Sequence, residues 1–361
     1  MNVFRLTILI ATLAIGIAHD CASTNGQAPA FVEFLDSGRI TRGLKLLDVP
    51  GETLILGRDG AMHSINSRDP RHQIQVLNEP YSPIPVPELR NQLRDEYGRG
   101  FEVHSTKNFL IVQPEGRGDQ WPKLFEESHR SFCDYVSKRG VKIREGRFPM
   151  VAVVMPDEQA MYREFKKWDI NMSRVAGVYS GKNNRVITHD GGSSDFVKAT
   201  VRHEAAHQSA FNSGVHSRLC DTPKWISEGL GQMFEPAGMT NRRRGAQTSD
   251  RINLDSLTFL KRTYPHRNDE DFAADVMQLF SDDTMFEHPK RVSNAYAVSW
   301  AVMFYLAERE PQNFARIINV TSSRQPFTDY PRTQRLRDVE EAVDSNILEL
   351  SKRVSWFVHS L

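Results

Sequence analysis

The chain of 361 residues has few cysteines, no excess of charge of one sign and few long apolar runs. Its three cysteines, Cys21, Cys133 and Cys220, include no CxxC pair, so a zinc site built from thiolates is not expected. They allow at most one internal disulfide, with Cys133–Cys220 as the candidate pair and separate thiols as the alternative. The 46 basic and 45 acidic residues nearly cancel, so no global field favours nucleic acid or an anionic membrane.

One extended apolar stretch lies at the N-terminus, where Arg5 precedes residues 6–18. This arrangement is typical of a secretory signal peptide, and the run is too short to span a membrane. We therefore expect cleavage after Ala18 and export to the periplasm or the extracellular space, with no stable membrane insertion of the mature chain. A retained N-terminal anchor or lipidation of Cys21 are the alternatives, although Asp20 is not the small residue that a lipidation site requires.

The remaining chain divides by composition and by turn signals. Residues 19–30 form a small polar leader, and whether this leader is a propeptide is open. Residues 31–80 contain short apolar runs separated by Pro-Gly and Asp-Gly turns, which predict a small β-rich module of barrel or SH3-like character. Residues 81–98, with a proline-rich start at 81–88, are expected to form a connector, and residues 99–361 a larger second domain. Because strands precede helices along the chain, we expect an α+β fold.

The chemistry is concentrated in the segment VRHEAAHQ. His203 and His207 are four positions apart, so a helix places both imidazoles on one face, where they can reach one zinc ion. Glu204 lies about 100° further round the helix, so it can take a proton from the attacking water without occupying a ligand position. Capping residues Ser194 and Asp195 and the later Gly214 favour a helix over this whole segment.

A third ligand is expected from the segment DTPKWISEGLGQMFE. Asp221 or Thr222 can cap a second helix that begins near Pro223, and Glu228 falls in its second turn. Two imidazoles, one carboxylate and an open fourth position are the ligand set of catalytic zinc sites, so we expect one Zn²⁺ per chain. Glycines inside a helix are costly, so Gly229 and Gly231 predict close packing on the HExxH helix.

These two segments resemble the gluzincin clan of zinc metallopeptidases, in which HExxH is followed by a glutamate in a W-x-x-E-G-x-A context. HEAAHQSAFNSGVH and PKWISEGLGQMFE are also similar to a family of secreted bacterial proteins of unknown function predicted to be gluzincins. The resemblance implies a zincin-like fold, with a twisted sheet above two ligand helices. It also implies that residues 184–190 form an edge strand that pairs with an extended peptide substrate. Gly231 departs from the usual alanine of the pattern.

Other residues are weaker candidates. A metzincin pattern fails because Ala210 and Ser213 stand where glycine and histidine are required, and His216 as third ligand lies beyond the expected helix end. Tyr296, 68 positions after Glu228, is the candidate for stabilising the oxyanion, since gluzincins of the aminopeptidase type place a tyrosine at a similar separation. His266 and His288 are more typical of surface residues. Arg202 can orient a carboxylate, with a solvent-facing salt bridge favoured.

We therefore expect a secreted zinc metallopeptidase that acts on peptides or proteins. Two alternatives remain at this stage. One is a zinc amidase acting on non-protein amides such as those of a cell wall, because the same site suits that chemistry. The other is a non-catalytic binding or scaffold protein with a structural metal site, and the intact Glu204 argues against it. Neither the bond preferred nor the oligomeric state follows from the sequence.

Overall fold

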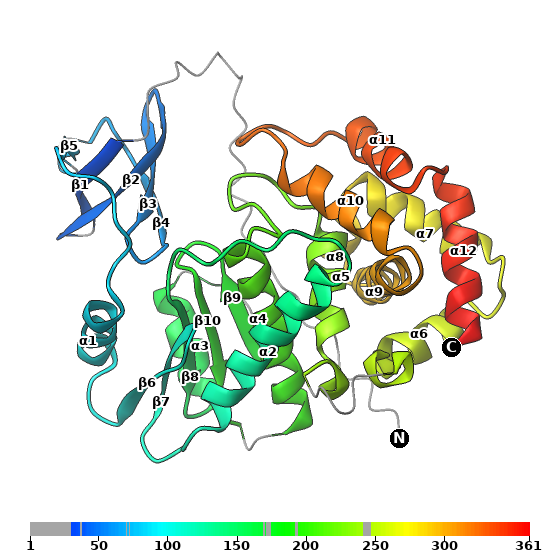
Figure 1. The fold of residues 1–361 in the computed structure, drawn as a ribbon, viewed down its shortest axis with the longest axis horizontal. Helices are drawn as coiled ribbons and strands as arrows, with labels where there is room; N and C mark the ends of the chain where they lie inside the picture. The colour runs from blue at the N-terminus through cyan, green and yellow to red at the C-terminus, as the bar shows by residue number, and fades with distance from the viewer. Residues whose placement is uncertain are drawn as a thin grey trace.

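The computed structural model describes residues 30–361, apart from positions 37, 70, 72, 169, 171–174, 192–193 and 241–246. The predicted signal peptide, Cys21 and nearly all of the polar leader lie outside the described residues. Figure 1 shows three regions along the longest axis: a first sheet, a second sheet covered by helices, and a larger group of helices. The chain is thus a mixed α+β protein with a β-rich N-terminal region and a helical C-terminal part, as predicted.

The first sheet contains five antiparallel strands in the order β4-β3-β2-β1-β5. Its strands are β1 (Ala30–Asp36), β2 (Arg39–Val49), β3 (Glu52–Gly57), β4 (Met62–Ile65) and β5 (Gln75–Val76). A small core of Val32, Phe34, Ile55 and Ile65 fills one side. Within the described residues β4 pairs only with β3 and β5 only with β1, so the sheet stays open where a barrel was predicted.

The second sheet has the order β6-β7-β8-β10-β9. Its strands are β6 (Phe101–Ser105), β7 (Phe109–Pro114), β8 (Met150–Met155), β9 (Gly177–Ser180) and β10 (Arg185–His189). The three inner strands are parallel, and the two outer strands are antiparallel to their neighbours. The predicted edge strand at residues 184–190 is therefore wrong. β10 lies inside the sheet because β9, the first arm of the same hairpin, takes the edge.

Four helices cover the second sheet on both faces. Alternate residues of β8 point to opposite faces, so Val151 and Val153 meet one pair of helices while Met150 and Ala152 meet the other. The first pair is α1 (Val86–Tyr97) and α3 (Glu158–Lys167); the second pair is α2 (Gln120–Ser137) and α4 (Asp195–Asn212). Helix α1 falls within the predicted connector, yet Leu89 and Leu93 are buried against this sheet.

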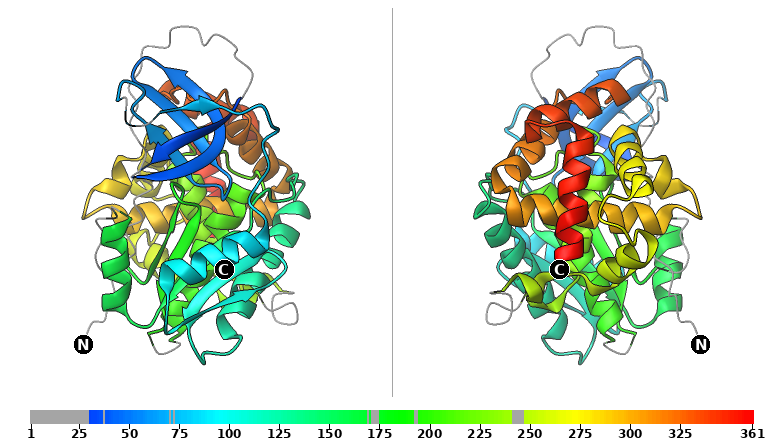
Figure 2. Two further views of the ribbon diagram at one scale, coloured as in Figure 1. Left: turned by 90° about the vertical axis from the view of Figure 1, so that its left-hand side faces the viewer. Right: turned by 90° about the vertical axis from the view of Figure 1, so that its right-hand side faces the viewer.

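The rest of the chain is helical and packs around one central helix. The helices are α5 (Lys224–Phe234), α6 (Leu254–Thr263), α7 (Glu270–Ser281), α8 (Thr284–Glu287), α9 (Val292–Arg309), α10 (Pro311–Ser322), α11 (Arg332–Val343) and α12 (Ile347–Ser360), with short 3₁₀ turns at Ala237–Met239 and Thr248–Arg251. The middle of helix α9 is buried all round. Figure 2 shows α12, in red, across the outer side of this region. No helix in the described part of the chain is long and apolar enough to cross a bilayer.

The first sheet is joined to the second by hydrogen bonds to main-chain carbonyls. The Met62 N–H at the start of β4 donates to the Lys182 carbonyl, 2.6 Å away, in the turn between β9 and β10. The side chain of Arg218, which follows α4, donates from one guanidinium nitrogen to the Gly60 carbonyl at 2.5 Å and from another to the Gly181 carbonyl. These bonds connect the turn after β3, the β9–β10 turn and the segment between α4 and α5.

Candidate metal centre

Helix α4 carries the HExxH segment and has the predicted limits. The Ser194 side chain accepts a hydrogen bond from the Val197 N–H at the N-terminus, and the helix ends at Asn212, two residues before Gly214. His203 and His207 are one turn apart on the same face, with their ring centroids 4.7 Å apart. The local sequence therefore sets the spacing of the first two candidate ligands.

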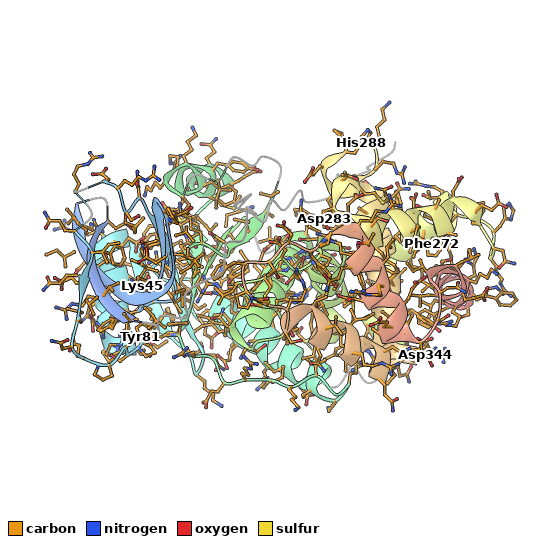
Figure 3. All side chains as sticks on the ribbon, turned by 90° about the horizontal axis from the view of Figure 1, so that it is seen from above. Lys45, Tyr81, Phe272, Asp283, His288 and Asp344 are labelled. Atoms are coloured by element: carbon orange, nitrogen blue, oxygen red, sulfur yellow. The ribbon has the colours of Figure 1, made fainter. Side chains whose placement is uncertain are left out.

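Helix α5 supplies the third side chain, with a start that the sequence predicted only in part. The helix begins at Lys224 after Pro223, as expected, but no side chain of its own segment caps it. Instead the Lys224 N–H donates to Asp283 Oδ1 at 2.9 Å. Asp283, which Figure 3 labels, lies in the turn before α8. A carboxylate distant in sequence thus replaces the predicted cap from Asp221 or Thr222.

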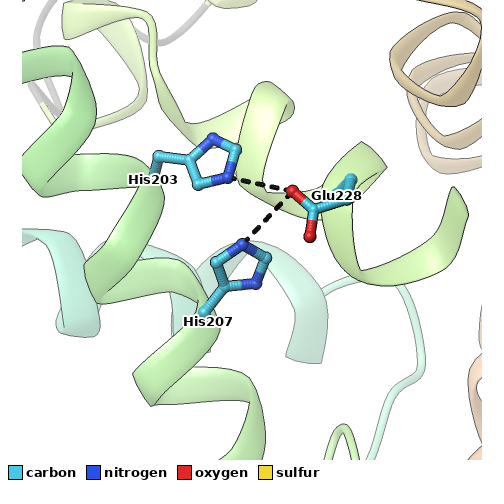
Figure 4. Close-up of side chains that lie close together, drawn as sticks. All are labelled: His203, His207 and Glu228. Carbon is cyan, nitrogen blue, oxygen red and sulfur yellow. Dashed lines mark ion pairs between the residues drawn. The ribbon is translucent and has the colours of Figure 1, made fainter. Parts of the chain in front are cut away.

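The three candidate ligands converge, as Figure 4 shows. Glu228 Oε2 lies 3.4 Å from His203 Nε2 and 3.6 Å from His207 Nε2, and one ligand atom of each residue lies within 4.8 Å of the others. Two atoms bound tetrahedrally to one zinc at about 2.0–2.1 Å are roughly 3.3–3.4 Å apart. The two distances from Glu228 Oε2 are close to that value, so the three residues could hold one metal ion.

The same atoms lack partners in the protein. His203 and Glu228 are fully buried, and His207 is 4% exposed. Within the described residues neither Nε2 atom nor either Glu228 oxygen has a hydrogen-bond partner. Buried polar atoms are nearly always paired, because an unpaired one costs about 1–3 kcal/mol. Three of these atoms, the two Nε2 atoms and Glu228 Oε2, converge on one point, which is accounted for if a cation binds between them.

The electrostatics of the group also favour a cation. Burial opposes protonation of His203, but the Glu228 and Glu235 carboxylates outweigh it and raise the pKa of His203 to about 10. Burial likewise opposes ionisation of Glu228, but His207 and His203 outweigh it and lower the pKa of Glu228 to about 2. The site therefore retains positive charge beside an ionised carboxylate. A divalent cation can replace that charge and release the protons.

A second set of residues holds His203 in place. Glu235 Oε1 lies 2.9 Å from His203 Nδ1, and the other carboxylate oxygen accepts from the Asn253 side-chain amide at 2.9 Å. Gln232 donates to Glu235 Oε1 at 2.8 Å. A carboxylate on the far nitrogen of a histidine ligand fixes its tautomer and orientation. Glu235 was not predicted from the sequence, although its position seven residues after Glu228 places it on the same side of α5.

Arg202 belongs to this supporting set. It is 7% exposed, and its Nε donates to the main-chain carbonyl of Glu235 at 2.6 Å. The solvent-facing salt bridge favoured from the sequence is therefore wrong. Arg202 orients the end of α5 from α4, next to the histidine that Glu235 contacts.

The two glycines of α5 permit close packing, on two different neighbours. A Cβ atom on Gly231 would lie 2.5 Å from His203 Nε2, so this position must be bare for the imidazole to fit. A Cβ atom on Gly229 would lie 2.7 Å from the Ser299 carbonyl on α9. The predicted packing on the HExxH helix is confirmed for Gly231, whereas Gly229 faces α9.

Glu204 lies beside the three candidate ligands and contacts the edge strand. It is fully buried, and its Oε2 accepts a hydrogen bond of 2.7 Å from the Tyr179 N–H of β9. The other oxygen, Oε1, is buried without a partner in the described chain. Burial raises the pKa of Glu204, with the neighbouring Glu228 charge acting in the same direction.

The remaining predicted residues are distributed over the molecule. Tyr296 is 3% exposed on α9, with its ring edge against Phe286 of α8 at 5.3 Å, and its catalytic role stays a prediction. His216 is buried but is not in the converging group. His266 and His288 are exposed as expected, and Figure 3 shows His288 at the surface.

The two cysteines inside the described chain, Cys133 and Cys220, are free thiols. The Cys220 Sγ donates to the Arg324 carbonyl at 3.1 Å. Cys133 instead lies 3.7 Å from His129 Nε2. The alternative of separate thiols is therefore correct for this pair.

Part of the chain matches a known protein family. A family model described as "Protein of unknown function (DUF1570)" matches residues 197–328, which include His203, Glu204, His207 and Glu228. No curated protein matches the chain. The matched region begins inside α4 and extends past α10, so the similarity is concentrated on the two helices that form the buried His-His-Glu group and on the helices packed around α9.

Proposed function

We propose that this protein is a zinc-dependent peptidase of the gluzincin type with a zincin-like fold, in which His203, His207 and Glu228 hold the metal. The observation that carries this proposal is the convergence of their buried, unpartnered ligand atoms. Two imidazoles and one carboxylate suit zinc, and three protein ligands leave a coordination position open for chemistry. Export through the predicted signal peptide is part of the same proposal.

The arrangement of Glu204 supports its role as the general base. When bound, zinc would act as a Lewis acid that makes water more acidic and polarises a peptide carbonyl. The Tyr179 N–H fixes one Glu204 oxygen and leaves Oε1 to accept a proton from the attacking water. The pKa of Glu204 is raised towards neutral pH. This suits a carboxylate that accepts this proton and then gives it to the leaving amine.

The edge strand β9 is the proposed place for the substrate backbone. The Tyr179 N–H donates to Glu204, so this residue of β9 turns its main-chain groups away from β10. Alternate residues of a strand behave alike, so Gly177 does the same. An extended peptide added along this edge would have its backbone next to Glu204. The edge strand thus links peptide binding to the general base.

The decisive experiment compares the purified chain with its Glu204→Gln variant after loading with ZnCl₂. Metal content is measured by mass spectrometry, and hydrolysis is measured on a pool of quenched fluorescent peptides with and without 1,10-phenanthroline. We expect one zinc per chain in both proteins, chelator-sensitive hydrolysis by the wild type, and a kcat lower by about 10²–10⁴-fold in the variant.

A matched control is Glu127→Gln, the same change at an exposed position of α2, which should retain full activity. Two results would refute the proposal. One is a wild-type chain that takes up no zinc after loading. The other is a Glu204→Gln variant that hydrolyses the peptides as fast as the wild type.

A further inference from the structure

His216 is a buried imidazole that the proposed function leaves unexplained. His216 is only 2% exposed, and neither of its ring nitrogens has a hydrogen-bond partner within the described residues. His129, a half-buried histidine on α2, instead has Ser209 Oγ 2.9 Å from its Nδ1. An unpaired buried polar group costs about 1–3 kcal/mol, so a histidine at position 216 needs a functional reason.

The chain after α4 folds back so that His216 returns to the HExxH helix. Gly214 has a φ of +78°, which reverses the chain, and the His216 N–H then donates to the Ala210 carbonyl at 3.0 Å. The His216 ring contacts the Phe211 ring edge-on, with centroids 5.2 Å apart. Phe211 is one turn beyond His207 on the same helix face. His216 therefore lies next to the candidate metal ligands on the side of the helix they occupy.

Phe211 also links His216 to the residue that holds Glu204, the proposed general base. Phe211 stacks on Tyr179 of β9, with centroids 5.7 Å apart and the rings 23° from parallel. Tyr179 is the residue whose N–H holds Glu204. His216, Phe211 and Tyr179 thus form one continuous row between the segment after α4 and the edge strand on which we place the substrate. This row runs beside both Glu204 and His207.

From this geometry we infer that His216 is a further catalytic residue, whose ring N–H donates a hydrogen bond to the substrate carbonyl oxygen as that oxygen becomes negatively charged. The inference rests on the proposed function. A buried, pre-positioned donor at a developing oxyanion is a strong source of catalysis, because it needs little reorganisation during the reaction. A ring without other partners is available for this bond.

The charge state of His216 agrees with this role. Burial and, to a smaller extent, the neighbouring His207 lower the pKa of His216 to about 3, so the ring is neutral across the physiological range. A neutral imidazole has one N–H donor. A divalent cation at His203, His207 and Glu228 would also disfavour the protonated form. The donor therefore stays neutral with or without the metal.

The test compares His216→Ala and His216→Gln with the wild type in four measurements: zinc content, thermal unfolding, peptide hydrolysis, and binding of a pool of phosphinic peptides by calorimetry. The tetrahedral phosphinate imitates the charged oxygen of the transition state, so its binding reports the donor without turnover. We expect both variants to keep one zinc. We expect His216→Ala to lower kcat by about 10²–10³-fold and to weaken phosphinate binding, with a smaller loss in His216→Gln, which retains an N–H donor.

Controls separate this role from others. His129→Gln, a change at a histidine outside the site, should alter thermal unfolding only. Loss of zinc from either His216 variant would make His216 a metal ligand, and unchanged kcat and phosphinate affinity would make it a packing residue; both results overturn the inference. The same holds if Tyr296→Phe reproduces the catalytic loss while His216→Ala does not. A wild-type protein that binds zinc but neither hydrolyses peptides nor binds phosphinates refutes the peptidase proposal itself.

Discussion

Two carboxylates with little exposure of their side chains to solvent have opposite surroundings in this protein. Glu308 on α9 accepts hydrogen bonds from Tyr135 at 2.7 Å, Arg139 at 2.6 Å and Arg251 at 2.6 Å, and its side chain is 7% exposed. Glu228 on α5 is fully buried, and neither of its oxygens has a hydrogen-bond partner in the described chain. Both side chains are shielded from solvent, so their exposure alone does not explain why their surroundings differ.

The difference indicates what each carboxylate is for. The protein itself supplies the full complement of donors and positive charge around Glu308, so this cluster is complete and structural. Glu228 has only the two histidines near it, at 3.4 and 3.6 Å, and no hydrogen-bond donor in the described chain, so this group can accept a ligand. A buried carboxylate without hydrogen-bond donors is therefore a better sign of a binding site than a buried charge as such.

The largest expected effect is the loss of folding stability when the cluster around Glu308 is broken. Glu308→Gln leaves Arg139 and Arg251, whose side chains are 15% and 13% exposed, without their counter-charge. Removing one partner of a buried ion pair typically costs roughly 3–5 kcal/mol of unfolding free energy. Urea denaturation followed by circular dichroism should show this loss with no change in metal content. Glu341→Gln, at an exposed position of α11, is the control and should change stability by less than about 0.5 kcal/mol.

A smaller effect is expected when the incomplete site loses its metal. With free zinc about 100 times above its dissociation constant, the ion stabilises the folded chain by about 2.7 kcal/mol, and chelation removes that amount. Glu228→Gln lacks the ligand, so its unfolding midpoint should not respond to zinc or to chelator. Differential scanning fluorimetry with and without EDTA checks both. If the variant still gained stability from zinc, Glu228 would not be a ligand.

The smallest effect is expected from a substitution of Glu235, which contacts a candidate metal ligand but is not one itself. Glu235 is partly exposed and reaches the site only through His203 Nδ1. Glu235→Gln should weaken zinc binding by about 10–100-fold while the three ligands remain, because the second partner of a histidine ligand tunes its orientation and basicity. Competition with a zinc-binding dye measures the change. Unaltered affinity would show that His203 is held by packing alone, through contacts such as that with Gly231.

The sequence predicted most of the features that depend on local signals. The limits of α4 follow from Ser194 and Gly214, and the start of α5 follows from Pro223, because capping and helix-ending preferences act over a few residues. The spacing of His203 and His207, with Glu228 on the next helix, was enough to propose the ligand set. These signals lie close together in the chain, so no knowledge of packing was needed.

The features that were missed or wrong depend on contacts between distant segments. Asp283 caps α5 from 59 positions away, and Asn253 supports Glu235 from a segment with no recognisable motif. The strand at 184–190 was predicted, but whether it or β9 forms the sheet edge depends on the pairing of β10 with β8. The position of Arg202 was likewise wrong because the burial of its side chain is set by the end of α5.

The bonds that join the first sheet to the β9–β10 turn have a mechanical consequence. The Met62 N–H donates a hydrogen bond to the Lys182 carbonyl, and Arg218 donates hydrogen bonds to the carbonyls of both Gly60 and Gly181. Arg218 follows His216 by two positions, and Gly181 follows the edge strand β9 directly, so the segment after α4 and the end of β9 are both tethered to the first sheet. A tilt of this sheet would therefore displace His216 and β9 together, which couples its position to the proposed active site.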